Sequence, residues 1–210
     1  MKQKILFFIF LLFSTLLATS SEFKVKEEIL KKIEKEFNLF AKKRVLALVK
    51  NMNEVRDGSD LEKLEKVNDF FNKVPYGKGI DIWGISDYWA TRYEFIGKDK
   101  GDCEDYVIAK YFTLLELGVD SSKLFMSYVR SSKFDAAHMV LTYYETPKSI
   151  PLVLDNYNYK VLPATQRGDL TPIYSFDGKE LFNAKQSRIG KLIPASTKQS
   201  RPWDELVITR

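Results

Sequence analysis

Helical spacing of apolar residues dominates the N-terminal part of the chain. Over residues 23–50, apolar side chains recur every three or four positions, which places them on one face of an α-helix. Residues 61–74 repeat this pattern, and Asp60 stands where a helix N-cap is expected. The segment 51–60 between them is polar and contains an Asp-Gly pair, so it predicts a turn.

The pattern changes twice after residue 80. Residues 80–99 are rich in aromatic side chains without a regular period, whereas residues 104–117 predict a helix that stops before Gly118, a residue type that favours helix ends. The period then falls to two, which predicts β-strands at 124–130, 138–144 and 151–155. Shorter segments that would extend the sheet or pack outside it lie around Val161, at 173–176 and at 206–208. Helices followed by antiparallel strands predict an α+β fold.

The start of the chain has the layout of a secretory signal peptide, over residues 1–20. Two lysines precede an uncharged apolar run, and Ala18 and Ser20 are small residues at the positions that a signal peptidase reads. The run has about 14 residues and a bilayer needs roughly 20, which favours cleavage over an uncleaved membrane anchor. We therefore predict export to a bacterial periplasm, with a helical part at 21–74 and a core with a C-terminal extension at 75–210.

Composition narrows the class of protein. The chain has 210 residues, of which 45% are hydrophobic and 29% are charged, values typical of a folded globular protein. Its net charge of +5 is spread without a basic stripe, so nucleic acid is not the expected partner. With one cysteine and one histidine, the chain forms neither an internal disulfide nor a zinc site built on several such ligands. Because no second long apolar run follows the leader, the mature protein is not expected to span a membrane.

The single cysteine and the single histidine stand where they can act together. Cys103 directly precedes a predicted helix, where unpaired backbone N–H groups and the helix dipole stabilise a thiolate. His138 begins a predicted strand and would act as the base, and Asp155 ends another strand and would orient the imidazole. Each residue also has a simpler interpretation, as a buried small apolar residue, a structural histidine and a turn-forming aspartate.

Acidic residues surround the cysteine and oppose its ionisation. Asp102, Glu104 and Asp105 lie within two positions of Cys103, and negative neighbours raise the pKa of a thiol. The helix dipole is worth about half a charge and does not offset three acids. Either these side chains point away or a cation neutralises them, and clustered oxygen ligands suit Ca²⁺. The alternative is that Glu104 and Asp105 are only first-turn acids favoured by the dipole.

Several segments together resemble a known family. They are Asp87–Thr91 (DYWAT), Gly101–Tyr106 (GDCEDY) with Ala109–Tyr111, His138–Leu141 and Leu152–Asn156. Their combination is similar to the bacterial transglutaminase-like cysteine proteinases of the LapG type. The resemblance implies a papain-like or transglutaminase-like fold with a triad of Cys103, His138 and Asp155. It also implies Ca²⁺-dependent activity, with Asp102 and Glu104 as ligands and Asp105 as a further candidate.

The same resemblance implies a substrate and a regulator. In this family the substrate is a large surface adhesin of the RTX type. It is cut near its N-terminus at a paired-alanine site, which releases the adhesin and disperses biofilm. An inner-membrane cyclic-di-GMP receptor of the LapD type sequesters the protease. The chain departs from the family at Arg92, where proline is expected, and this bears on a loop conformation more than on the chemistry.

Other functions fit the same residues. A cell-wall peptidase or a true transglutaminase would use the same Cys-His-Asp arrangement, and a catalytically inactive binding module would keep the fold without the activity. In any acyl transfer at Cys103, its own backbone N–H is an expected oxyanion donor, with the indole N–H of Trp83 or Trp89 as a candidate for the second.

Overall fold

The described part of the chain folds into helices followed by an antiparallel sheet. The computed structural model describes residues 22–85, 88–177, 181–185 and 188–193, the last two for their backbone alone. The α-helices are α1 (Glu27–Glu36), α2 (Leu39–Val55), α3 (Asp60–Phe71), α4 (Gly79–Trp83), α5 (Arg92–Lys98) and α6 (Cys103–Glu116). The strands are β1 (Leu124–Ser131), β2 (Ala136–Tyr143), β3 (Leu152–Leu154), β4 (Leu162–Pro163), β5 (Leu170–Phe176), β6 (Leu181–Lys185) and β7 (Arg188–Ile193). Short 3₁₀ turns at Ser121–Lys123 and Ala164–Gln166 precede β1 and β5.

The sheet places β2 at a central position beside the helices. Its strand order is β4-β3-β2-β1-β5-β6-β7, and every pairing is antiparallel. His138 in β2 pairs with Val129 in β1, and Leu141 further along β2 pairs with Leu154 at the end of β3. The residue after β3, Asp155, therefore emerges on the His138 side of β2. The predicted α+β fold is confirmed.

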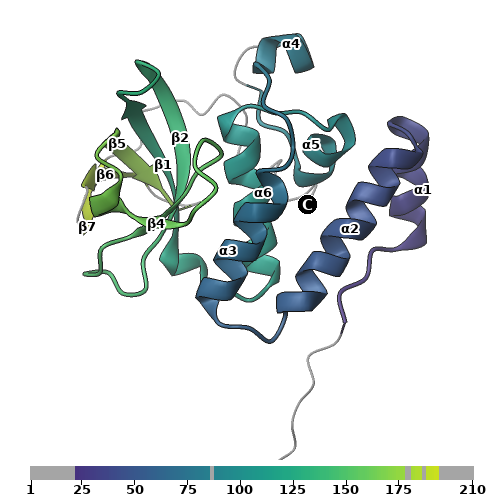
Figure 1. The fold of residues 1–210 in the computed structure, drawn as a ribbon, viewed down its shortest axis with the longest axis horizontal. Helices are drawn as coiled ribbons and strands as arrows, with labels where there is room; N and C mark the ends of the chain where they lie inside the picture. Colours follow the sequence, from purple (N-terminus) through teal and green to yellow (C-terminus); the bar gives the residue numbers. More distant parts are fainter. Residues whose placement is uncertain (1–21, 86–87, 178–180, 186–187, 194–210) are drawn as a thin grey trace, which may run out of the picture.

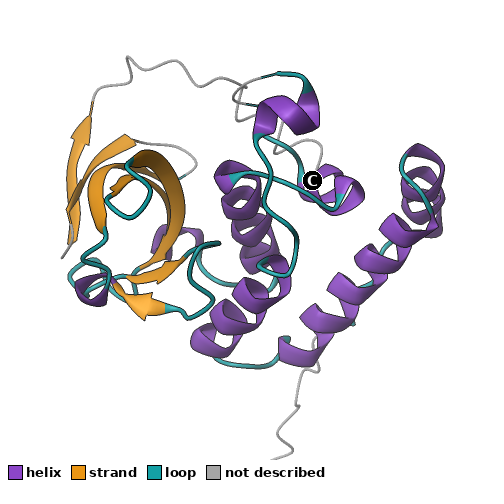
Figure 2. Cartoon of the chain, turned by 45° about the horizontal axis from the view of Figure 1, so that its top comes forward, coloured by secondary structure: helices purple, strands orange, loops and turns teal. Residues whose placement is uncertain are grey.

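Helix α6 lies between the sheet and the other helices (Figure 1). It packs on β1 and β2, while α3 and α5 pack on α6 and α1 covers α2 (Figures 1 and 2). One buried cluster joins all these layers, with members such as Leu30 of α1, Val45 of α2, Ile108 of α6 and Leu141 of β2. Burying this apolar surface is the main force that holds the helix carrying the cysteine against the strand carrying the histidine.

The single helix predicted over residues 23–50 is wrong, because two helices occupy this region. The chain breaks between α1 and α2 at Asn38, whose side-chain oxygen accepts the Ala41 N–H at 2.9 Å and so caps α2. Helix α2 then continues to Val55, through half of the segment predicted as a turn, because Leu48 and Met52 extend its buried face.

The predicted cap of the next helix is also wrong. Ser59, not Asp60, caps α3: its hydroxyl accepts the Glu62 N–H, and its own N–H donates to the Glu62 carboxylate at 2.7 Å. The Asp60 carboxylate instead accepts hydrogen bonds from the Tyr143 hydroxyl at 2.7 Å and the Lys123 ammonium at 3.1 Å. It thereby ties the start of α3 to the sheet.

The aromatic segment 80–99, which has no period in the sequence, contains α4 and α5. A capping box of Thr91 and Glu94 starts α5. Arg92 is the first residue of this helix, and its buried guanidinium donates to Glu116 at 2.7 Å and Thr113 at 3.3 Å, both on α6. Arg92, at the position where the resemblance leads us to expect proline, thus joins α5 to α6.

Helix α6 and strands β1, β2 and β3 follow the predictions closely, whereas no strand is predicted from the sequence at β6 or β7. Helix α6 ends before Gly118, which has a positive φ of 83° as expected for a helix stop. The predicted strands differ from β1, β2 and β3 by one or two residues at their ends, the region after Val161 forms β4, and residues 173–176 fall within β5. The predicted leader 1–20 and the segment 206–208 lie outside the described residues. Within the described part, no helix is long and apolar enough to cross a membrane.

Candidate active site

Cys103 is the first residue of α6, and its neighbours build the helix start. Asp102 is the N-cap, and its backbone N–H donates to the Asp105 carboxylate at 3.2 Å. Asp105 is fully buried and also accepts the Ala90 N–H at 2.9 Å and the Trp83 indole N–H at 3.4 Å. Burial raises its pKa to about 6 although these donors lower it. Asp105 therefore organises the loop before the cysteine, and the Trp83 indole is engaged here.

Asp102 and Glu104 form a pair of like charges beside the sulfur. Burial, followed by the charges of Glu104 and Asp105, raises the pKa of Asp102 to about 8. One oxygen of Asp102 is buried without a hydrogen-bond partner among the described residues. The other lies so close to Gly79 that a Cβ there would stand 2.4 Å from it. Among the described residues, no lysine or arginine side chain forms an ion pair with either carboxylate.

The same pair holds the thiol in its protonated form. The Cys103 sulfhydryl donates to the Glu104 carboxylate over 2.9 Å from sulfur to oxygen. Burial and the Glu104 charge raise the pKa of Cys103 well above its ordinary value, as the acids in the sequence predict, while the Met139 backbone N–H acts in the opposite direction. Because Met139 follows His138 in β2, the sulfur lies beside the strand that carries the imidazole. Cys103 itself is only partly buried.

His138 and Asp155 are in direct contact. The Nε2 atom of His138 and Oδ1 of Asp155 are 2.8 Å apart, and both side chains are almost completely buried. Asp155 Oδ1 also accepts the Tyr157 N–H at 2.9 Å, while its Oδ2 accepts from Arg167 at 2.6 Å. Burial opposes ionisation of Asp155, but the hydrogen bonds from His138, Tyr157 and Arg167 outweigh it and hold its pKa at about 2.

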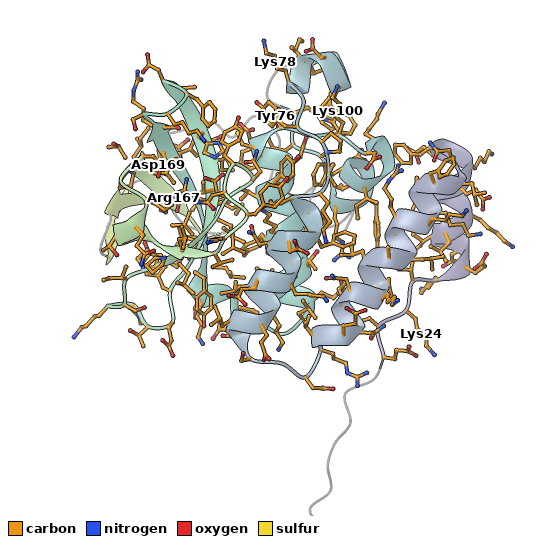
Figure 3. All side chains as sticks on the ribbon, in the orientation of Figure 1. Lys24, Tyr76, Lys78, Lys100, Arg167 and Asp169 are labelled. Carbon is orange, nitrogen blue, oxygen red and sulfur yellow. The ribbon has the colours of Figure 1, made fainter. Side chains whose placement is uncertain are left out.

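Arg167 is the residue at this site that the sequence did not reveal. It follows a short 3₁₀ turn, it is buried, and it also binds Asp169 at 2.8 Å and 2.9 Å. Figure 3 labels both residues on the sheet side of the molecule. In the sequence, Arg167 is one of 33 basic residues, and it lies outside every segment that carries the resemblance to the family. Only the fold brings it to Asp155.

An aromatic group extends from the imidazole to the surface. The ring of Tyr157 stacks on His138 with centroids 4.6 Å apart and an angle of 28°. Tyr157 also contacts the rings of Phe134, at 4.3 Å, and Tyr76, at 5.6 Å. Tyr76 and Phe134 are each nearly half exposed, so the aromatic group extends from the buried imidazole to the surface, where Figure 3 labels Tyr76.

Gly101 has a different role from the one that its place before the cysteine suggests. A glycine there would leave room for a substrate, but a Cβ at Gly101 would lie 2.5 Å from the ring of Phe95 and 2.9 Å from Asp105. The glycine is therefore required for packing within the core. It also anchors the loop, because its carbonyl accepts the Gly77 N–H at 2.9 Å.

The comparisons with known proteins agree with this fold. Residues 42–170 match the model of the bacterial transglutaminase-like cysteine proteinases (BTLCP), so the chain belongs to this family of cysteine proteinases. It is similar to the solved structure of calcium-bound LapG from Legionella pneumophila, with 37% identity and a TM-score of 0.73 over 88% of this chain and 99% of that one. The EGTA-treated form of LapG matches at 37% identity with a TM-score of 0.72, covering 88% of this chain and 97% of that one. A search of curated proteins gives no match.

Proposed function

We propose that this protein is a Ca²⁺-dependent cysteine endopeptidase of the periplasm with Cys103, His138 and Asp155 as its triad. One observation carries the proposal: His138 and Asp155 are 2.8 Å apart. Their contact lies next to Met139, whose backbone N–H is hydrogen-bonded to Cys103. Family membership supports the reaction class. The predicted leader supports the location.

In the proposed reaction, Asp155 keeps the imidazole proton on Nε2, so that Nδ1 takes the proton of the Cys103 thiol. The thiolate attacks the scissile peptide carbonyl, and the Cys103 N–H at the start of α6 donates to the resulting oxyanion. The imidazolium then protonates the leaving amine, which departs and leaves a thioester. A water molecule deprotonated by His138 hydrolyses this thioester and restores the thiol.

The acids beside the sulfur fit a bound calcium ion. Asp102 and Glu104 offer adjacent carboxylates, one with an unpartnered buried oxygen, which is the hard-ligand chemistry that Ca²⁺ prefers. Within the described residues no group of three acidic, histidine or cysteine side chains is arranged to hold a metal. Backbone carbonyls, water and the loop acid Asp87, which lies outside the described residues, are candidates for further ligands. We assign Asp102 and Glu104 as ligands; Asp105, named with them from the sequence, is already bonded to three N–H groups and positions them. Bound calcium would supply the positive charge that the pair lacks.

The proposed substrate is the N-terminal region of a large RTX-type surface adhesin, and cleavage would release the adhesin and disperse biofilm. The proposed regulator is an inner-membrane cyclic-di-GMP receptor of the LapD type that sequesters the protease. Both proposals rest on the similarity to LapG, and the calcium-bound and EGTA-treated structures of LapG support a calcium role in that protein.

The direct test mixes the purified protein with an N-terminal adhesin fragment from the same cell. We expect one cut with Ca²⁺, none with excess EGTA, and none from Cys103→Ala, which should remain folded and still bind the receptor's periplasmic domain. A Cys103→Ala variant that still cleaves would eliminate the mechanism. Incorporation of a primary amine instead of hydrolysis would identify a transglutaminase, and release of fragments from purified peptidoglycan would identify a cell-wall enzyme.

A further inference from the structure

A fully buried lysine lies behind the triad. Lys110 is in α6, about two helical turns after Cys103 and on the same side of the helix. Its ammonium donates to two side-chain amide oxygens, Asn68 Oδ1 of α3 at 2.8 Å and Oδ1 of Asn72, the C-cap of α3, at 2.7 Å. Burying a long cationic side chain is costly unless it makes good hydrogen bonds, so these two contacts are what keep Lys110 in the core.

The lysine determines which way both amides point. A charged lysine ammonium only donates hydrogen bonds, so each Asn turns its oxygen to Lys110 and its NH₂ group away. The Asn72 NH₂ then donates to the Asp155 carbonyl at 2.8 Å, and the Asn68 NH₂ donates to the Tyr159 carbonyl at 3.0 Å. Because Asn72 is the C-cap of α3 and lies four residues after Asn68, the two side chains are on the same face at the end of this helix.

The two carbonyls belong to Asp155 and Tyr159, the first and last residues of the segment 155–159. This segment holds the imidazole of His138. Asp155, at its start, bonds to His138, and Tyr157, in its middle, stacks on the same ring. The Tyr157 N–H also donates to the Asp155 carboxylate. A shift of residues 155–159 would therefore move both groups that fix the orientation of His138.

We propose that Lys110 is a positioning residue for catalysis, which acts through Asn72 and Asn68 to fix residues 155–159 and so to aim Asp155 at His138. This inference rests on the proposed triad. Through this connection, the helix that carries the nucleophile also sets the position of the triad acid. Positioning errors of about 1 Å lower rates by about 10²-fold, so the connection has a measurable effect on turnover.

A matched pair of variants tests it. Asn72→Asp and Asn68→Asp each add the same charge next to Lys110 and keep an acceptor for its ammonium, but each loses one donor, to the Asp155 or the Tyr159 carbonyl. We expect the plateau of kcat against pH to fall by about 10²-fold in Asn72→Asp and by less than about tenfold in Asn68→Asp, with KM unchanged in both. Because the plateau of kcat is read where the rate no longer depends on pH, comparing plateaus separates a misaligned imidazole from a simple shift of the His138 pKa.

A second readout does not need a substrate. His138 is the only histidine in the chain, so its ring nitrogen resonances in NMR need no assignment if a tag without histidine is used. We expect the proton on Nε2 in the wild type and a mixture of tautomers in Asn72→Asp. Lys110→Met removes the ammonium that donates to the Asn72 amide oxygen, and it should change the spectrum in the same way. Arg92→Met is the matched control, a buried cation whose bonds to Thr113 and Glu116 do not reach the triad.

The outcomes separate this inference from the proposed function. If Cys103→Ala is inactive while Asn72→Asp or a folded Lys110→Met keeps the wild-type plateau and tautomer, the inference is wrong and the triad stands. If Cys103→Ala is active, the proposed function fails first. If Arg92→Met lowers the plateau as much as Lys110→Met, general loosening of the core explains both, and Lys110 has no positioning role.

Discussion

Two groups of carboxylates flank the reacting atoms, and they differ in what balances their charge. At the start of α6, the partly buried Asp102 and Glu104 lie side by side without a cationic side chain paired to them among the described residues, and the pKa of Asp102 rises to about 8 because of burial and the neighbouring charges. At the end of β3, Asp155 is almost fully buried, yet its hydrogen bonds from His138, Tyr157 and Arg167 hold its pKa at about 2.

This difference indicates two ways of keeping an acid ionised inside a protein. Asp155 has its cation built into the fold, so its charge is available to His138 under all ordinary conditions. The pair at α6 requires a cation from outside, which makes the state of the neighbouring thiol depend on what is bound there. The first arrangement suits a permanent part of the machinery, and the second suits a point of control.

The largest effect should come from removing the charge of Asp155. Asp155→Asn keeps the shape but removes the charge and leaves one acceptor oxygen for the donors of His138 and Arg167. With that oxygen toward Arg167, the NH₂ group faces Nε2, so the wrong tautomer of His138 becomes populated. We expect kcat to fall by about 10⁴-fold, the loss seen when the acid of a serine-protease triad is changed in this way. Steady-state cleavage of the adhesin fragment measures it, and a loss below tenfold would contradict the assignment of the triad acid.

Removing the built-in cation should destabilise the fold. Arg167→Met leaves Asp155 buried without its partner, and breaking a buried ion pair from one side costs about 3–5 kcal/mol of unfolding free energy. Urea denaturation measures this cost. Asp169→Asn is the control, because it removes only the outer, partly exposed partner of Arg167 and should cost at most about 1 kcal/mol. Equal costs for both variants would show that the contact between Arg167 and Asp155 is not special.

Supplying the missing cation at α6 should stabilise the protein. A ligand at a hundred times its dissociation constant adds about 2.7 kcal/mol of stability. We expect Ca²⁺ to raise the melting temperature and Mg²⁺ to do so far less, because Mg²⁺ demands stricter geometry. Calorimetry on the wild type and on Asp102→Asn tests this. A calcium-dependent rise that persists in Asp102→Asn would place the ion elsewhere.

Acid should expose the contribution of Asp155 to stability. Its pKa is about 2 in the folded protein and 3.8 in its unperturbed state, so the stabilisation is present above pH 4 and is lost as the pH falls through 2. The expected loss is about 2 kcal/mol. Denaturation curves at pH 5 and at about pH 2 measure it by difference against Asp155→Asn, which lacks this titration. Parallel losses in the two proteins would contradict the depressed pKa.

The local pattern of the sequence was sufficient for most of the elements. Periods of three to four and of two located α3, α6 and the central strands, because one face of each is buried in the core. The pattern failed where side-chain capping, not periodicity, sets the boundary. Asn38 divides the first helix, Ser59 takes the cap expected of Asp60, and Thr91 starts α5 within an aromatic stretch.

For the site, the sequence by itself singled out Cys103, His138 and Asp155 and the conflict between the thiol and its acidic neighbours. These conclusions follow from residue chemistry and from scarcity, because the chain has one thiol and one imidazole. Tertiary structure alone decided which buried side chains the cations Arg167 and Lys110 bind. Arg167 and Lys110 are two among many basic residues until the sheet and α3 pack on α6, and charge compensation in a protein interior depends on contacts between residues far apart in the chain.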